Sequence, residues 1–354
     1  PPRSTLFPYT TLFRSNPKQW TLLPSNARVQ YKKLLSIQKG MLEYSEQSKF
    51  NSMELKGDKK FGVIASGIGF NYLSEYMDDE SVAIPFLKIG VYPLPIEKIR
   101  DFCANVESVI LLEDGYPFIE EKLIGMLPNQ YKIHGRLDGT LPRDGELNPI
   151  LVRKALGGKP FETEKNPDME IPQRPPALCK GCPHGDLYQA LNKVMEANPQ
   201  GRVFSDIGCY TLGALPPYNS ITTCVDMGAS ISMAKGASDC GVSPSIAVIG
   251  DSTFAHSGIT PLLGAIRENS NIKVIILDNA TVAMTGGQQT MATGDALDNI
   301  IKGLGLDMTH FRLISPFPKN HEENVKILKE EFDYKGTSVL ICRRECIQTA
   351  KKKK

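Results

Sequence analysis

Oxygen-bearing side chains follow two apolar, strand-length segments in the second half of the chain. Residues 245–249 lead into Gly250-Asp251-Ser252, and residues 273–277 lead into Asp278-Asn279. Parallel strands end at the same edge of a sheet, so we expect these side chains to meet in one crevice. Mg²⁺ prefers oxygen ligands and pairs with phosphates. Asp251, Asn279 and the backbone carbonyl of Thr281 therefore predict a magnesium site that faces a diphosphate.

The spacing of these segments resembles the pattern of thiamine-diphosphate enzymes, in which Gly-Asp-Gly is followed after a similar interval by Asn-Asn. Asn279 lies 29 positions after Gly250. Ser252 takes the place of the third glycine, and Asp278 takes the place of the first asparagine. A lone Gly-Asp is an ordinary strand-end turn, but the interval and the two strand contexts together favour the cofactor.

Two further segments are candidates for contacts with the diphosphate. Gly228-Ala229-Ser230 opens a predicted helix, where small residues admit a cofactor and a helix N-terminus favours phosphate. Thr285-Gly286-Gly287-Gln288 follows the predicted metal ligands Asn279 and Thr281 and is predicted to cover the diphosphate. A plain surface turn is the alternative for this second segment.

Four cysteines form a second candidate site. Cys179 and Cys182 make a C-x-x-C pair, which serves zinc, redox chemistry and iron–sulfur clusters alike. The sequence has no second such pair to complete a typical zinc site. Cys209 and Cys346 each follow a predicted strand, so the four thiolates are candidates to converge on a [4Fe–4S] cluster. Unrelated thiols are the alternative. His184 is predicted either to contact the cofactor or to cap a helix.

Two α/β domains are expected to position these residues, because strands alternate with helices. Residues 16–60 are predicted to be a helical connector, with a helix over 26–49. The first domain covers 61–135, with strands at 61–65, 84–89 and 108–112 and helices at 71–77, 95–104 and 117–126. A proline-rich linker over 136–177 holds one short helix, at 149–156.

The second predicted domain covers residues 178–350. Its expected strands are 202–205, 221–225, 245–249, 273–277 and 337–341. Its expected helices are 184–197, 229–239, 258–268, 294–303 and 322–332. All strands of both domains are predicted to be parallel, and the diphosphate site lies in this second domain.

Together the motifs resemble the large (alpha) subunit of indolepyruvate ferredoxin oxidoreductases. The similarity runs from about residue 20 to the end and is strongest after Arg174. It rests on Cys-Lys-Gly-Cys-Pro-His-Gly-Asp at 179–186, Ser-Asp-Ile-Gly-Cys-Tyr-Thr-Leu at 205–212, and residues 226–230, 250–258, 285–288 and 343–346. Residues 113–121 fit the family's middle domain. The resemblance implies a transketolase C-terminal-like domain followed by a thiamine-diphosphate-binding domain.

That resemblance also implies an activity. The family oxidatively decarboxylates aryl pyruvates to acyl-coenzyme A with thiamine diphosphate, Mg²⁺ and a [4Fe–4S] cluster held by cysteines that match Cys179, Cys182, Cys209 and Cys346. Electrons pass to ferredoxin, and a smaller beta subunit completes the enzyme. The glutamate that activates the cofactor lies in an N-terminal domain, and a C-terminal ferredoxin-like domain follows. We find neither domain in this sequence, so we expect an incomplete subunit that binds cofactor weakly and turns over nothing. Residues 1–15 resemble a non-native artefact.

The composition of the chain argues against other classes of protein, such as nucleic-acid-binding and membrane-spanning proteins. The 354 residues are 41% hydrophobic and 23% charged, and the formal net charge is +2. A near-neutral body argues against nucleic-acid binding, and no apolar run is long enough for a membrane span, so we expect a cytoplasmic protein. Three alternatives remain: an oxidoreductase for pyruvate or another 2-oxo acid, a non-catalytic metal-binding fragment, and a nucleotide-binding fold. The last would use Gly67 and Gly69, but Tyr72 takes the place of the third glycine.

Overall fold

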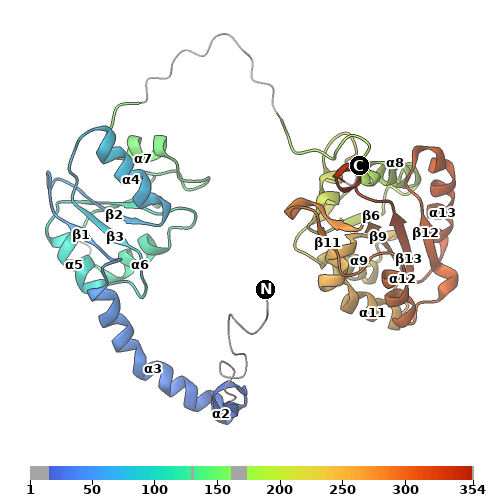
Figure 1. Cartoon of the computed structure of the whole chain (residues 1–354), viewed down its shortest axis with the longest axis horizontal. Coiled ribbons are helices and arrows are strands. Elements are labelled where there is room, and N and C mark those ends of the chain that lie inside the picture. The colour runs from blue at the N-terminus through green and yellow to red at the C-terminus, as the bar shows by residue number, and fades with distance from the viewer. Residues whose placement is uncertain (1–15, 129–130, 161–173, 353–354) are drawn as a thin grey trace, which may run out of the picture. The chain divides into compact units, whose positions relative to one another are not determined.

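The computed structural model describes residues 16–128, 131–160 and 174–352. The chain divides into two compact units, Pro1–Met169 and Glu170–Lys354. Each is an α/β unit built on its own sheet (Figure 1). The predicted artefact at 1–15 lies outside the described residues.

The first unit is built on a five-stranded sheet in the order β1-β3-β2-β4-β5. Its strands are β1 (Met53–Glu54), β2 (Gly62–Ser66), β3 (Phe86–Ile89), β4 (Val109–Leu112) and β5 (Ile133–His134). All pairs are parallel except β1 with β3. The central strands are apolar at nearly every position because helices cover both faces. The helices α5 (Ile96–Ala104) and α6 (Phe118–Met126) pack on one face, and α4 (Ile68–Asp79) and α7 (Pro149–Ala155) pack on the other.

The predicted linker over 136–177 is wrong in its first part. Leu141, Leu147, Val152 and Leu156 are all buried against the face of the sheet that α4 covers. The helix α7 starts at a proline, and the side chain of Asn148 accepts a hydrogen bond from the Leu151 N–H at 3.0 Å. Residues 136–160 therefore belong to the first unit, since their apolar side chains complete its core. Residues 161–173 lie outside the described part of the chain.

A long helix precedes the first sheet, as predicted. It is α3 (Pro24–Gln47), preceded by the short α2 (Pro17–Trp20), and Ser45 is the buried residue of α3. The connector ends earlier than expected, because β1 joins the edge of the sheet and the buried side chain of Asn51 accepts hydrogen bonds from the N–H groups of Gly90 and Val91. No helix within the described ranges combines the length and apolarity needed to cross a bilayer.

The second unit is built on a six-stranded parallel sheet in the order β12-β13-β9-β8-β6-β7. The strands are β6 (Arg202–Ser205), β7 (Thr223–Cys224), β8 (Ser245–Gly250), β9 (Ile272–Asp278), β12 (Phe311–Ile314) and β13 (Ser338–Arg343). Every residue of β8 and β9 is buried. The adjacency of these two strands, on which the predicted metal site depends, is confirmed by their pairing.

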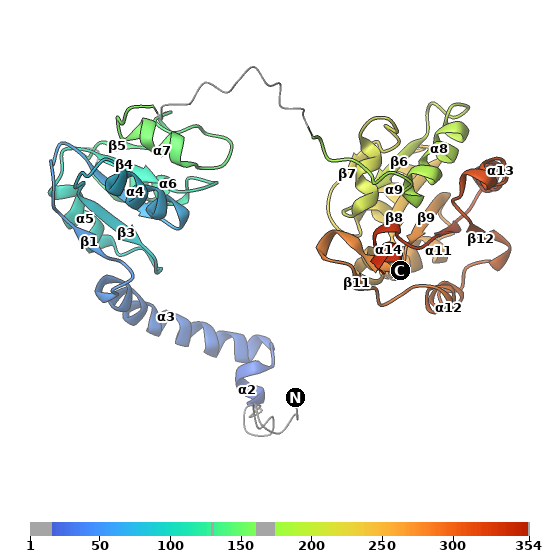
Figure 2. The same ribbon diagram turned by 45° about the horizontal axis from the view of Figure 1, so that its top comes forward.

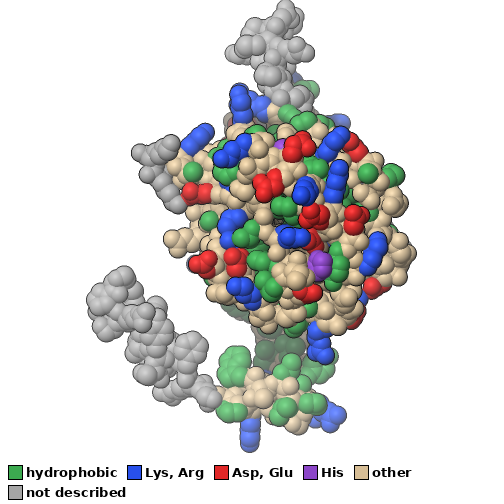
Figure 3. Space-filling view, turned by 90° about the vertical axis from the view of Figure 1, so that its right-hand side faces the viewer, with side chains coloured by type: hydrophobic (Ala, Val, Ile, Leu, Met, Phe, Trp, Pro, Cys, Tyr) green, Lys and Arg blue, Asp and Glu red, His purple; other side chains and the backbone are tan. Residues whose placement is uncertain are grey.

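Helices cover both faces of this second sheet (Figure 2). The helices α8 (Pro183–Met195) and α13 (His321–Asp333) pack on one face, and α9 (Ala229–Asp239), α11 (Ile259–Arg267) and α12 (Asp295–Gly303) pack on the other. A small hairpin of β10 (Thr281–Val282) and β11 (Gln288–Gln289) follows β9. On the face seen in Figure 3, basic and acidic side chains are mixed rather than separated.

Candidate cofactor and metal site

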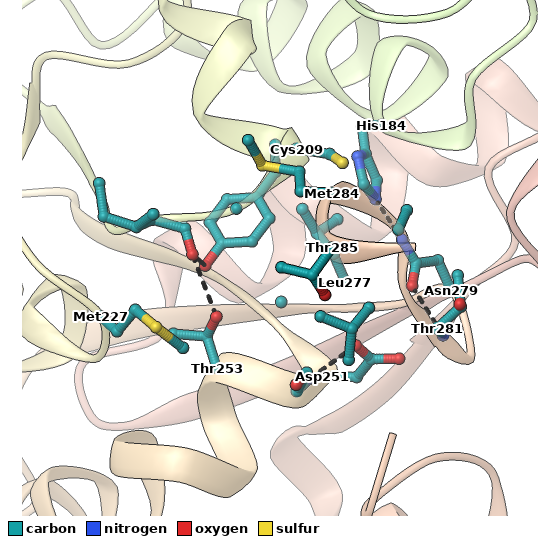
Figure 4. Close-up of a pocket in the computed structure, with 17 residues that line it drawn as sticks. His184, Cys209, Met227, Asp251, Thr253, Leu277, Asn279, Thr281, Met284 and Thr285 are labelled. Atoms are coloured by element: carbon teal, nitrogen blue, oxygen red, sulfur yellow. Dashed lines mark hydrogen bonds between the residues drawn. The ribbon is translucent and has the colours of Figure 1, made fainter. Parts of the chain in front are cut away.

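A cavity of about 230 Å³ lies beside the carboxyl ends of β8 and β9 (Figure 4). Predicted site residues that line it come from four segments: His184, Cys209, Gly250, Asp251, Ser252, Asn279, Thr281 and Thr285. Apolar walls are supplied by Ile207, Met227, Leu277 and Met284. The crevice expected at the strand ends is thus present, and both oxygen-bearing and apolar side chains line it.

Asp251 is the buried charge of this cavity. It is 2% exposed, and its two carboxylate oxygens accept hydrogen bonds from Ser252 N–H at 2.6 Å and Ala280 N–H at 2.9 Å. Burial, with a smaller contribution from Asp278, raises the pKa of Asp251 to about 7. None of the described Lys or Arg residues forms an ion pair with it. A buried carboxylate without a counter-charge is costly, and a divalent cation would offset that cost.

Two neutral oxygens accompany this carboxylate. Asn279 and Thr281 are 8% and 5% exposed, and both line the cavity. The Asn279 side-chain oxygen accepts a hydrogen bond from Thr281 N–H at 3.1 Å, which fixes the amide plane. One carboxylate, one amide oxygen and a backbone carbonyl are a donor set that fits Mg²⁺ bound to a diphosphate.

Asp278, which replaces the first asparagine of the motif, does not line the cavity. Its carboxylate is paired with the Arg343 guanidinium at 2.7 Å, and it accepts hydrogen bonds from the Thr293 hydroxyl and from Gly294 N–H. Arg343 also pairs with Asp298 at 2.5 Å. Asp278 therefore anchors the far end of the segment that begins with Asn279. An aspartate in place of the motif's first asparagine leaves the candidate ligands Asp251, Asn279 and Thr281 beside the cavity.

Asp206 is a functional candidate that the sequence analysis missed. It is fully buried after β6, and burial raises its pKa. Its carboxylate accepts hydrogen bonds from the Ser230 hydroxyl at 2.6 Å, from Gly228 N–H at 3.2 Å and, at short range, from the Tyr210 hydroxyl. The predicted turn Gly228-Ala229-Ser230 is thus held by Asp206, and those three residues lie outside the cavity lining. The available signal was a polar residue at a strand end, as at Asp251.

Tyr210 was also missed, and it forms part of the cavity wall. Its backbone carbonyl accepts a hydrogen bond from the Tyr188 hydroxyl at 2.7 Å, and its ring lies against Gly250. A Cβ atom at position 250 would come within 2.6 Å of the Tyr210 ring. Gly250 is therefore required for close packing beneath this tyrosine.

Of the segment 285–288, which was predicted to cover the diphosphate, the first residue borders the cavity beside Asp251. Thr285 lines the cavity, and its hydroxyl contacts the Gln288 side-chain oxygen at 2.7 Å. Gly286 and Gly287 have φ values of +125° and +86°, which glycine adopts without strain. Gly287 and Gln288 line a separate cavity of about 480 Å³. In this structure Thr285 alone of the four faces the cavity beside Asp251.

The four predicted cysteines line one cavity of about 130 Å³. Cys182 is the residue that precedes the first turn of α8, and its backbone carbonyl accepts a hydrogen bond from Gly185 N–H at 3.1 Å. Burial raises the pKa of Cys182 to about 11, and Cys179 and Cys346 add to that shift. Within the described residues, no three His, Cys, Asp or Glu side chains are arranged to hold a metal ion as they stand. The thiols surround a space and do not converge on one point.

Backbone and side-chain contacts connect the cavity lined by the four cysteines (the cysteine cavity) to the segment that begins with Asn279. Cys346 N–H donates to the carbonyl of Asn279 at 3.2 Å. The Arg344 guanidinium binds Asp186 at 2.6 Å and the carbonyl of Gly181, which lies inside the C-x-x-C loop, at 3.4 Å. The segment after β13 that carries Cys346 is therefore hydrogen-bonded both to the end of β9 and to the loop that carries Cys179 and Cys182.

The two cavities share a wall. His184, Cys209, Asn279 and Ala283 line both of them. The His184 ring is 3% exposed, and burial lowers its pKa to about 4, so the ring is neutral near pH 7. It packs edge-on against Tyr210, with ring centroids 6.2 Å apart. His184 thus lines the cavity beside Asp251, and its backbone takes part in the first turn of α8.

Comparison with known proteins finds similarity both within the second unit and along nearly the whole chain. Residues 206–342 match the family described as thiamine pyrophosphate enzyme, C-terminal TPP binding domain. The indolepyruvate oxidoreductase subunit IorA of Methanothermobacter thermautotrophicus is 32% identical over 362 residues, which cover 96% of this chain and 58% of that protein. The IorA subunit of Archaeoglobus fulgidus is 32% identical over 357 residues, with coverages of 94% and 56%.

Solved structures show a more distant likeness. A 2-oxoglutarate:ferredoxin oxidoreductase from Magnetococcus marinus matches with a TM-score of 0.41 and 16% identity, over 50% of this chain and 68% of that one. The chain spans about half the length of the curated relatives it matches. Along nearly all of its own length it is similar to IorA subunits of indolepyruvate oxidoreductases, which confirms the resemblance predicted from its motifs.

Proposed function

We propose that this chain is the cofactor-holding part of a thiamine-diphosphate-dependent oxidoreductase of 2-oxo acids, with aryl pyruvates such as indolepyruvate as substrates. The main support is Asp251, a buried carboxylate without a counter-charge that lies beside Asn279 and Thr281 in a cavity at the strand ends. The family match over residues 206–342 and the similarity to IorA subunits support the choice of cofactor and substrate class.

The residues present fit Mg²⁺ and the diphosphate. Asp251, the Asn279 amide oxygen and the Thr281 carbonyl would hold the cation. Gly250, Ser252 and Thr285 line the same cavity and would border the diphosphate. When bound, thiamine diphosphate supplies a nucleophilic carbon and an electron sink for decarboxylation of the 2-oxo acid. The chain's own contribution is to hold the cation, to position the cofactor against Tyr210 and to surround it with apolar side chains that limit water.

The cysteine cavity fits an iron–sulfur cluster beside the cofactor. Four thiols surround it, the N-terminus of α8 favours negative charge on Cys182, and the cavity shares His184 and Asn279 with the cofactor site. A [4Fe–4S] cluster there would carry single electrons toward ferredoxin, with coenzyme A taking the acyl group. A beta subunit would complete the enzyme. In this proposal the isolated chain binds cofactor weakly and is inactive.

Calorimetric titration of the full chain with thiamine diphosphate tests the proposal. We expect binding in the presence of Mg²⁺ and none in its absence. Asp251→Ala should abolish this binding. Asp239→Ala is the matched control, because Asp239 lies at the C-terminal end of α9 with its side chain 56% exposed. Thiamine diphosphate binding that does not depend on Mg²⁺, or that is retained in a folded Asp251→Ala variant, would contradict the proposed cofactor site.

Metal analysis of the anaerobically reconstituted chain tests the cysteine site separately. We expect iron and sulfide to be retained, and alanine at Cys182 or Cys209 to reduce both. Zinc without iron would favour the non-catalytic metal-binding alternative. Steady turnover of indolepyruvate by the isolated chain would contradict the expectation that it is inactive, and a preference for pyruvate in the assembled enzyme would contradict the substrate class.

A further inference from the structure

The hydrogen-bond network determines which nitrogen of His184 carries the proton. The Asn279 side-chain oxygen accepts from Thr281 N–H at 3.1 Å, so the amide nitrogen is the end that faces His184. That nitrogen lies 3.5 Å from His184 Nε2. An amide nitrogen only donates, so Nε2 must accept. The neutral ring then carries its proton on Nδ1.

The Nδ1 atom has no hydrogen-bond partner among the described residues, although it is fully buried. The whole side chain is 3% exposed, so bulk water does not satisfy it. A buried donor without an acceptor destabilises the fold, because it has lost its hydrogen bond to water and gained none. The cost is removed if the acceptor arrives with a group that binds in one of the two adjacent cavities.

The position of the ring indicates which cavity supplies that acceptor. His184 and Cys209 both lie in the shared wall of the two cavities. Figure 4 shows Nε2 directed at Asn279, which leaves Nδ1 on the side of the ring nearer Cys209. The cysteine cavity is lined by four sulfurs, which accept N–H hydrogen bonds when they are thiolates or part of a cluster.

We propose that the Nδ1–H of His184 donates a hydrogen bond to a sulfur of the group held by the four cysteines, and that His184 thereby raises the reduction potential of that group. This inference rests on the proposed function. An N–H donor stabilises the more negative, reduced state of a cluster, so its presence favours reduction. His184 is a positioning residue here: one nitrogen orients Asn279 at the metal site and the other reaches the sulfur site.

Three substitutions test the proposal in the anaerobically reconstituted full chain. His184→Asn places an amide N–H where Nδ1 lies, His184→Gln extends the amide to the position of Nε2, and His184→Phe keeps the ring volume without any donor. The potential is measured by a redox titration followed by electron paramagnetic resonance. Iron content and melting temperature are recorded for each variant.

We expect His184→Phe and His184→Gln to shift the potential to more negative values and His184→Asn to stay near the wild-type value. Equal potentials for the asparagine and glutamine variants would overturn the inference. It would also fail if His184→Phe changed thiamine-diphosphate affinity and left the potential unchanged, because Nδ1 would then serve the cofactor. A wild-type chain that retains no iron would instead overturn the proposed cluster itself, which distinguishes the two failures.

Discussion

Asp251→Asn should stabilise the second unit while it removes metal binding. The folded pKa of Asp251 is about 7 and the ordinary value is 3.8. At about 1.4 kcal/mol per pKa unit, the carboxylate costs the metal-free fold about 4 kcal/mol at pH 8. Asparagine removes the charge but leaves either Ser252 N–H or Ala280 N–H without its acceptor, which costs about 1–3 kcal/mol. The net gain is about 1–3 kcal/mol, so removal of the charge dominates.

The pH dependence has a definite sign. The folded state holds the Asp251 proton more tightly than the unfolded state, so wild-type stability falls as the pH rises from about 4 to about 7. The Asn variant should lack this fall. Added Mg²⁺ should stabilise the wild-type chain at pH 8 and leave the variant unchanged, because only the wild type presents a carboxylate to the ion.

Urea denaturation followed by circular dichroism, in chelator and at pH 5 and pH 8, measures these differences. Protection of β8 and β9 from proteolysis reports the unfolding of the second unit separately from that of the first. Asp239→Asn is the control, since its carboxylate is exposed and paired with Lys235. An Asp251→Asn variant that is less stable than wild type at pH 8, with an unchanged pH dependence, would refute the reasoning that the carboxylate is buried at a cost.

Three further outcomes follow from specific contacts. Gly250→Ala should lower stability by about 1–3 kcal/mol and weaken cofactor binding, since its Cβ would lie 2.6 Å from the Tyr210 ring; an unchanged melting temperature and titration would contradict this. The reconstituted Arg344→Ala variant should release iron to a chelator faster than wild type, because Arg344 no longer holds Asp186 and the Gly181 carbonyl of the C-x-x-C loop; equal release rates would contradict a role for these contacts in iron retention. Burial lowers the pKa of Lys273 to about 8, so stability should rise with pH between about 8 and 10.5 in urea titrations, and Lys273→Met should remove that rise.

Much of the architecture was predictable because its core strands are hydrophobic throughout. The strands β8 and β9 are apolar runs because both faces of a parallel sheet are covered, and such runs are visible in a sequence. The missed strands are short: β1, β5, β10 and β11 have two residues each, and β12 has four. Three of them, β1, β5 and β12, lie at sheet edges, and each depends on a partner that local sequence does not identify. The packing of residues 136–160 was hidden by their prolines.

The cavity that holds the candidate metal ligands was predictable for a similar reason, whereas the residues that support it were not. Asp251 and Asn279 end two strands that pair with each other, so their meeting follows from the order of the chain. Asp206 and Tyr210 lie inside the 205–212 motif, but that motif does not show what they contact. Asp206 accepts a hydrogen bond from Ser230, 24 positions away, and from the Tyr210 hydroxyl. Asp278 was recognised as a departure from the motif. Its ion-pair partner Arg343 lies 65 positions further along the chain, so the pairing could not be predicted from local sequence.

The two α/β units, the oxygen-bearing strand ends and the resemblance to IorA subunits could all be predicted from the amino-acid sequence, because hydrophobic periodicity and motif spacing are local properties. Which of those side chains share a cavity became known from the folded chain. It turned Asp278 and Ser230 toward structural partners, and it placed His184 in a wall between two cavities. The physical reason is that burial and hydrogen-bond direction depend on side chains brought together by folding, and these two quantities set the charge state and the function of each polar group.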